Sequence, residues 1–134
     1  SDMMKPPESW KGSFGDRLGM EYEHFEPGHT VASFVVTGVH RNPPGVCHGG
    51  AVFTCADDTM GAAVFPLSPE GTLPTANQVD IRLVRSAQPG ERLRAESRVL
   101  HHGRRTAVAE SRVTDEEGRL VALATGSFLF VETR

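Results

Sequence analysis

The sequence predicts an α+β fold in which an antiparallel β-sheet wraps around one long central helix. Three observations support this prediction. One apolar segment, 49–65, has a helix-forming composition; six strand-like segments flank it in the order β-β-α-β-β-β-β; and turn-forming dipeptides separate the strands. With 134 residues, the chain is long enough for one domain with a substantial core.

The N-terminal segment is polar and contains proline and glycine, which is typical of a loose arm or a short helix. We therefore expect an N-terminal arm, 1–16, followed by a single domain, 17–134. The segments LGMEYEHFEP and HTVASFVVTG predict the first two strands, and Pro27-Gly28 between them is a turn signal. The segment RNPPGVCH that follows predicts a loop.

The central helix is expected from Gly49 to about Phe65. Alanine and methionine favour a helix in this segment, and Pro66 predicts its end. Because apolar residues lie on nearly all sides of this helix, it should be buried on nearly all sides.

Four strands should follow the helix, separated by turns at Pro89-Gly90, His102-Gly103 and Glu117-Gly118. Their sequences are TANQVDIRLVR, ERLRAESRVLH, RTAVAESRVTDE and LVALATGSFLFVE. The last strand is apolar at both alternating sets of positions, which predicts that both of its faces are covered. One helix cannot cover both faces, so we expect a second copy of the chain: a homodimer that pairs further into a dimer of dimers.

The sequence indicates in which cellular compartment the protein should be found. No run approaches the roughly 18 apolar residues of a membrane span, and SDMMKPPESW lacks the apolar core of a secretory signal. Cys47 and Cys55 would lie too far apart along the helix for a disulfide. We therefore expect a cytoplasmic protein with no membrane segment.

Charge is distributed unevenly along the chain. The net charge is −3, yet the segment 82–105 has a charge of +5, from seven arginines and two glutamates. Such a segment is typical of a site for an anionic ligand such as a phosphorylated cofactor, and equally of a solvated strand face with Arg–Glu pairs. With 7% aromatic residues and no binding motif, we expect no nucleic-acid partner.

The segment NPPGVCHGGAVFTCADDTMG combines features of a catalytic site. Gly49 and Gly50 at a helix start expose backbone N–H groups that can hold the oxygen of a polarised carbonyl, although a plain Gly-Gly turn has the same sequence. Asp57 and Asp58 lie in the apolar helix, where a carboxylate can take a proton from water or attack a carbonyl. Adjacent helix positions diverge by about 100°, so the two acids should have different roles.

This segment resembles the hotdog-fold acyl-CoA thioesterases of the phenylacetate-pathway (PaaI-like) group. The shared pattern is an asparagine, then His-Gly-Gly six residues later, then an acid nine residues after the histidine; here these are Asn42, His48-Gly49-Gly50 and Asp57. The expected strand order agrees with that family. The resemblance implies hydrolysis of an acyl-CoA thioester to the free acid and coenzyme A (CoA), with no cofactor because CoA is part of the substrate.

The resemblance also implies a role for each matching residue. The Gly49 N–H, with Asn42 nearby, would polarise the thioester carbonyl. His48 would orient the loop or contact the leaving sulfur, and Asp57 would be the general base or the nucleophile. Asp58 matches no catalytic position and is expected to be a structural acid.

The resemblance implies roles for further positions. Some relatives have a serine or threonine on the strand after the helix that helps to hold the attacking water; this chain has Gln78 there, whose amide can also bind water, and we expect Gln78 to be a catalytic-site residue. Relatives bind CoA at the subunit interface near the turn between the fourth and fifth strands. The residues expected to bind CoA are Gly50, Arg82, Arg85, Arg104 and Arg105.

Two other functions remain open. One is a hotdog enoyl-CoA hydratase or dehydratase, although Arg41 stands where that class needs an aspartate. The other is a non-catalytic acyl-CoA binding protein, which would explain a pocket but not a buried acid. We expect no metal site, because His101 and His102 should point to opposite sides of a strand and Cys47-His48 offers too few ligands.

Overall fold

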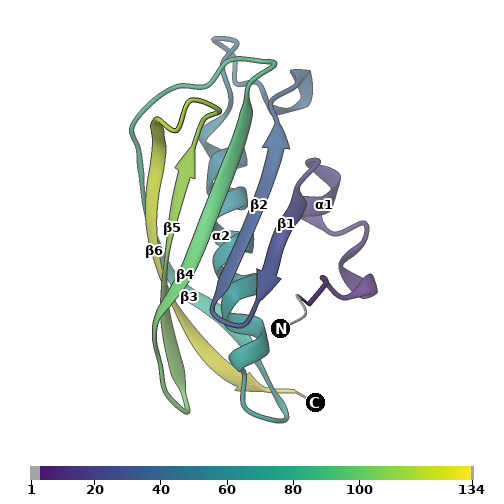
Figure 1. Cartoon of the computed structure of the whole chain (residues 1–134), viewed down its shortest axis with the longest axis vertical. Coiled ribbons are helices and arrows are strands. Elements are labelled where there is room, and N and C mark those ends of the chain that lie inside the picture. Colours follow the sequence, from purple (N-terminus) through teal and green to yellow (C-terminus); the bar gives the residue numbers. More distant parts are fainter. Residues whose placement is uncertain (1–3, 134) are drawn as a thin grey trace.

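A six-stranded antiparallel sheet curves around helix α2 in the computed structural model of the chain, which describes residues 4–133 (Figure 1). The elements in chain order are η1 (Glu8–Trp10), α1 (Phe14–Arg17), β1 (Glu21–Glu26), β2 (His29–Val35), η2 (Gly38–His40), α2 (Gly49–Val64), η3 (Phe65–Leu67), β3 (Thr72–Leu83), β4 (Arg92–His102), β5 (Thr106–Thr114) and β6 (Leu120–Glu132). The order of strands across the sheet is β1-β2-β4-β5-β6-β3. The predicted α+β class and the predicted order of the long elements are confirmed.

Helix α2 lies along the concave face of the sheet and contacts all six strands. The helix ends within one residue of its expected end, and the chain continues as the short 3₁₀ helix η3, in which Pro66 removes a backbone donor. Cys55, Ala56, Met60 and Ala63 of α2 are fully buried. Their small or flexible side chains allow the sheet to pack close to the helix axis.

The N-terminal segment forms two short helical turns that pack on the body of the molecule. The ring of Trp10 lies 5.6 Å from that of Phe25 and 5.3 Å from that of Phe65, measured between centroids. Helix α1 spans residue 16, where we placed the end of the arm, and that division of the chain stays a prediction.

Strand β6 is only partly covered within one chain. Val121, Ala122 and Ala124 are buried, but Leu129 and Val131 are 42% and 47% exposed. Leu73 of edge strand β3, which is paired with Val131, is also 47% exposed. An apolar surface therefore remains open where β3 and β6 meet. No helix among residues 4–133 is long and apolar enough to cross a membrane.

Candidate active site

The start of α2 leaves one backbone N–H group without an acceptor. His48 is the N-cap residue, and its Nδ1 accepts a hydrogen bond of 2.8 Å from the N–H of Gly50. The N–H of Ala51 donates to the carbonyl oxygen of His48 at 2.9 Å. Within residues 4–133, the N–H of Gly49 donates to no other residue. Gly49 is therefore the better oxyanion donor of the two glycines, because the N–H of Gly50 is already bonded.

Neighbouring side chains lie close to both glycines at the start of α2. A Cβ atom on Gly49 would lie 2.6 Å from Cδ1 of Leu83, and one on Gly50 would lie 2.9 Å from Nδ1 of His48. Leu83 is 55% exposed, so its side chain covers the start of α2 from the solvent side. A side chain at position 49 would have to displace this cover.

The loop before α2 is held by its own hydrogen bonds. Oδ1 of Asn42 accepts from the N–H groups of Gly45 at 3.2 Å and Val46 at 3.1 Å. The N–H of Cys47 donates to the carbonyl oxygen of Ala87 at 2.8 Å, which ties the loop to the connection between β3 and β4. Because the side-chain oxygen of Asn42 is engaged, its NH₂ group is the part that can donate to a ligand.

Asp57 and Asp58 line a cavity of about 1040 Å³ between the N-terminal arm, β1, α2 and β3. Aromatic side chains, including those of Tyr22, Phe65 and Phe128, form much of its wall. Cavities of this kind, mostly apolar with a few polar groups, are typical of small-molecule sites.

Burial changes the proton affinity of both acids. Burial raises the pKa of Asp57, and it raises the pKa of Asp58 to about 6, with the neighbouring charge of Asp57 as the second cause. Neither carboxylate accepts a hydrogen bond from a residue in the described part of the chain. An under-solvated carboxylate beside an apolar cavity has the proton affinity that a general base needs.

The two acids differ in their neighbours. Oδ2 of Asp58 packs against Gly15 of α1, where an added Cβ atom would lie 2.1 Å from it. The hydroxyl group of Tyr22 donates to the backbone oxygen of Asp58 at 3.2 Å. Asp58 therefore lies at the contact between the arm and the helix.

One chain does not bring all the expected residues together. Asp57 follows Gly49 by eight residues on one helix, which separates them by about 12 Å along its axis. Asn42, His48 and Gly49 do not line the cavity that holds Asp57. A single thioester carbonyl therefore cannot touch the Gly49 N–H and the Asp57 carboxylate of the same chain.

Gln78 also lies away from this cavity. It is exposed on β3, donates from Nε2 to Oδ2 of Asp80 at 3.1 Å, and borders a smaller hollow of about 200 Å³ that includes Ser127. Its amide is thus not beside Asp57 within one chain.

The arginines of the basic segment divide into paired and unpaired groups. Arg94 pairs with Glu23 at 3.3 Å, and Arg98 pairs with Glu96 at 3.2 Å, as expected for a solvated strand face. Within residues 4–133, five arginines of this segment form no ion pair: Arg82, Arg85, Arg92, Arg104 and Arg105. Arg92 donates instead to the hydroxyl oxygen of Ser33 at 3.0 Å. The other four, the unpaired arginines, have no side-chain partner among the described residues, and they are the four that we expected to bind CoA.

The four unpaired arginines do not form one patch within a single chain. Arg82 and Arg85 lie at or just beyond the end of β3, near the start of α2, whereas Arg104 and Arg105 form the turn between β4 and β5. Figure 1 shows the start of α2 and this turn at opposite ends of the molecule.

One group of polar residues was missed in the sequence. His24, Glu26 and His29 come together on the β1–β2 hairpin. The signal was present in HFEPGH, because a two-residue turn at Pro27-Gly28 places the histidine after it opposite the glutamate before it.

Comparisons with known proteins agree with this geometry. Residues 44–122 match the model of the thioesterase superfamily. The acyl-coenzyme A thioesterase PaaI of Escherichia coli is 28% identical over 81% of this chain and 76% of its own length. The structure of E. coli PaaI superposes with a TM-score of 0.80 at 26% identity, covering 87% of this chain and 83% of that one.

Two further relatives are informative. A protein of Archaeoglobus fulgidus, provisionally named an esterase, is 34% identical over 75% of this chain, which spans 63% of the length of that relative. A hypothetical thioesterase of Streptococcus pneumoniae, crystallised with coenzyme A, superposes with a TM-score of 0.78 at 30% identity, covering 86% of this chain and 90% of that one.

Proposed function

The chain belongs to the thioesterase superfamily and has the hotdog fold of its PaaI-like group, and from this premise we propose that it hydrolyses acyl-CoA thioesters. One observation supports the proposal most directly: Asp57, whose pKa is raised, faces a large apolar cavity from a helix whose first N–H group has no acceptor among residues 4–133. The products would be a carboxylic acid and coenzyme A.

The reaction needs a polarised carbonyl and an activated nucleophile. The N–H of Gly49 donates to the thioester oxygen, which becomes negatively charged as the tetrahedral intermediate forms. Asp57 takes a proton from a water molecule, whose oxygen attacks the carbonyl carbon; the C–S bond then breaks and the CoA sulfur receives a proton. Alternatively, the Asp57 carboxylate attacks the carbonyl carbon first and the C–S bond breaks, so that the CoA thiolate leaves and takes a proton from water. A second water molecule then hydrolyses the resulting anhydride to the free acid and the Asp57 carboxylate.

The distance between these two groups requires a second chain. Because Gly49 and Asp57 of one helix are about 12 Å apart, each site combines Gly49 of one chain with Asp57 of another. The open apolar surface formed by Leu73, Leu129 and Val131 supports such an association, since exposed apolar patches commonly mark interfaces. We place the homodimer, and a dimer of dimers built from it, in this proposal.

The four unpaired arginines support an anionic substrate. In the two-chain arrangement, Arg82 and Arg85 of one chain and Arg104 and Arg105 of another can serve the same CoA molecule, whose phosphates carry several negative charges. The pneumococcal relative, solved with coenzyme A, makes this ligand class the natural one to test.

A hydrolysis screen tests the proposal. The purified protein is given aryl, short, medium and long acyl-CoAs, and release of free thiol is followed with a chromogenic disulfide. We expect release from at least one class, with a preference for acyl groups large enough to fill the cavity of about 1040 Å³. Enoyl-CoA is included, because hydration of its double bond without thiol release would instead indicate the hydratase reaction.

A further inference from the structure

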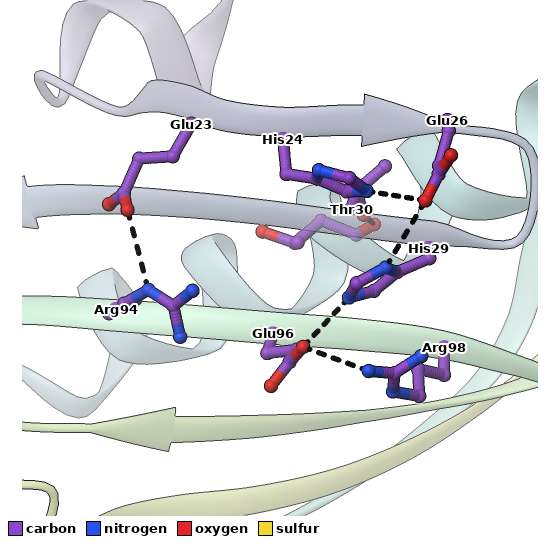
Figure 2. Close-up of polar contacts among 9 residues, drawn as sticks. Glu23, His24, Glu26, His29, Thr30, Arg94, Glu96 and Arg98 are labelled. Carbon is purple, nitrogen blue, oxygen red and sulfur yellow. Dashed lines mark hydrogen bonds and ion pairs between the residues drawn. The ribbon is translucent and has the colours of Figure 1, made fainter. Parts of the chain in front are cut away.

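Three side chains of the β1–β2 hairpin converge on the outer face of the sheet, away from α2 (Figure 2). Nε2 of His24 lies 2.6 Å from Oε1 of Glu26, and Nδ1 of His29 lies 3.6 Å from the same oxygen. One nitrogen or oxygen atom from each of the three lies within 4.8 Å of the others.

The hairpin register explains this convergence. His24 and Glu26 are two residues apart on β1, so they share one face, and Glu26 is paired directly with His29 across the turn. The hydroxyl group of the next residue, Thr30, donates to the backbone oxygen of Thr59 in α2. Since neighbouring strand residues point to opposite faces, His29 points away from the helix.

A neighbouring carboxylate selects the tautomer of His29. Its Nε2 lies 2.7 Å from Oε2 of Glu96 on β4, so this nitrogen carries the hydrogen that the carboxylate accepts. The neutral ring then presents the Nδ1 lone pair to His24 and Glu26. Metal-binding histidines in proteins commonly have this arrangement, in which a carboxylate orients the ring through the other nitrogen.

We propose that His24, Glu26 and His29 bind a divalent transition-metal ion of the zinc class, with Glu96 as the residue that positions His29. Two imidazole nitrogens and one carboxylate oxygen are a donor set suited to such ions, and water can complete the coordination. The three side chains are 22–38% exposed, so an ion can reach them.

The existing distances are close to those that an ion needs. Tetrahedral coordination at about 2.0–2.1 Å places the donor atoms about 3.4 Å apart, so the 3.6 Å between His29 and Glu26 needs little change, while the 2.6 Å between His24 and Glu26 must widen by about 0.8 Å. Rotation of the His24 and Glu26 side chains can supply this widening. The ion would fasten edge strand β1 to β2.

Without an ion, the same residues form a hydrogen-bonded network with Glu96. Hydrogen bonds from His24 and His29 lower the pKa of Glu26 and Glu96, respectively. Arg98 also pairs with Glu96 at 3.2 Å. The two states differ in their response to added zinc.

Calorimetric titration of tag-free, EDTA-treated protein with Zn²⁺ distinguishes the two states, with Co²⁺ absorption as a second probe. We expect one ion per chain in the wild type and a loss of at least 100-fold in affinity in the His24→Gln/His29→Gln variant. The matched control, His101→Gln/His102→Gln, removes two histidines from the end of β4 and should bind as the wild type does. Glu96→Gln should weaken binding about 10–100-fold.

Zinc should also raise the thermal midpoint of the wild type and of the control, but not that of the double variant. If the double variant does not fold, His29→Gln alone replaces it. Binding in the wild type that is no tighter than in the His24/His29 variants would overturn the proposal, as would loss of the site in the control alone. Acyl-CoA hydrolysis should survive EDTA, so failure of this proposal leaves the proposed function intact.

Discussion

At the scale of single residues, the carboxyl groups of Asp57 and Asp58 share one cavity wall but meet different neighbours. Asp58 packs against Gly15 of the arm, where its Oδ2 is the nearest atom to an added Cβ. We expect Asp57→Asn to lower kcat about 10²–10⁴-fold, because the amide keeps the shape but cannot take a proton or act as a nucleophile. Asp58→Asn is the matched control and should keep most of the wild-type kcat. If Asp58→Asn were inactive while Asp57→Asn still hydrolysed the thioester, the two acids would have the opposite roles.

Asp58 also makes a prediction about stability and pH. Burial raises its pKa to about 6, so the folded chain holds a proton that the unfolded chain releases near pH 4. Stability contributed by this group is therefore present below about pH 4 and is lost as pH rises to about 6. Thermal melts of Asp58→Asn and wild type should nearly coincide at about pH 4, with the variant melting higher at neutral pH; a constant offset at all pH values would contradict this.

The helix start at Gly49 could be predicted from the sequence, but the contacts around it could not. The spacing of His48, Gly49 and Asp57 indicated a helix start and an acid on the same helix. The hydrogen bond from the Gly50 N–H to Nδ1 of His48 depends on the side-chain torsions of His48, which no periodicity encodes. The Gly15–Asp58 contact was equally hidden, because it joins segments that are more than forty residues apart.

At the scale of elements, the arm and α2 are coupled through Gly15. An added Cβ atom there would lie 2.1 Å from Oδ2 of Asp58 and 2.9 Å from Sδ of Met20. We expect Gly15→Ala to loosen the arm, which should speed its removal in limited proteolysis and change the acyl preference, since the arm lines the cavity. Gly38→Ala is the matched control, because its nearest neighbour is 3.9 Å away. Equal cleavage of the two variants would contradict the coupling.

Element order was predictable for a physical reason. Pro27-Gly28 marks a turn between two strands, and Pro66 marks the end of a long apolar segment that has a helix-forming composition. Together these signals favour the order β-β-α-β-β-β-β over other orders of strands and helices. The hairpin cluster was not predicted, although HFEPGH contains its signal. The register is regular from His24 to His29, and the pairing of Glu26 with His29 across the Pro27-Gly28 turn places the three side chains on one face. The irregularity of this hairpin lies before the cluster, between Tyr22 and His24.

At the scale of the whole molecule, the unpaired arginines predict how CoA is held. Arg104→Ala/Arg105→Ala should raise KM for acyl-CoA with little change in kcat, and should weaken the dependence of KM on salt. Arg94→Ala/Arg98→Ala removes the same charge from residues paired with Glu23 and Glu96, and should change KM less. If both variants raised KM for acyl-CoA equally, the effect would come from the overall charge of the protein and not from contacts of Arg104 and Arg105 with CoA.

The apolar surface at β3 and β6 is a candidate interface between two copies of the chain. The sequence indicated this interface only indirectly, because the last strand is apolar on both faces and one helix can cover only one of them. In the proposed mechanism each site combines residues of two chains, because Gly49 and Asp57 of one chain are about 12 Å apart, so two differently inactivated chains should complement each other. We expect the Asp57→Asn chain and the Gly49→Ala chain each to be nearly inactive alone. In a mixed dimer, one site combines Gly49 of the first chain with Asp57 of the second and is intact, whereas the other site has both substitutions.

The most direct measurement is therefore acyl-CoA hydrolysis by these two variants, unfolded together at equal concentration and refolded. Random pairing should restore about a quarter of the wild-type rate, because half of the dimers are mixed and each has one intact site. Each variant refolded alone should stay inactive. A mixture no more active than the mean of the two separate variants would contradict a site shared between chains.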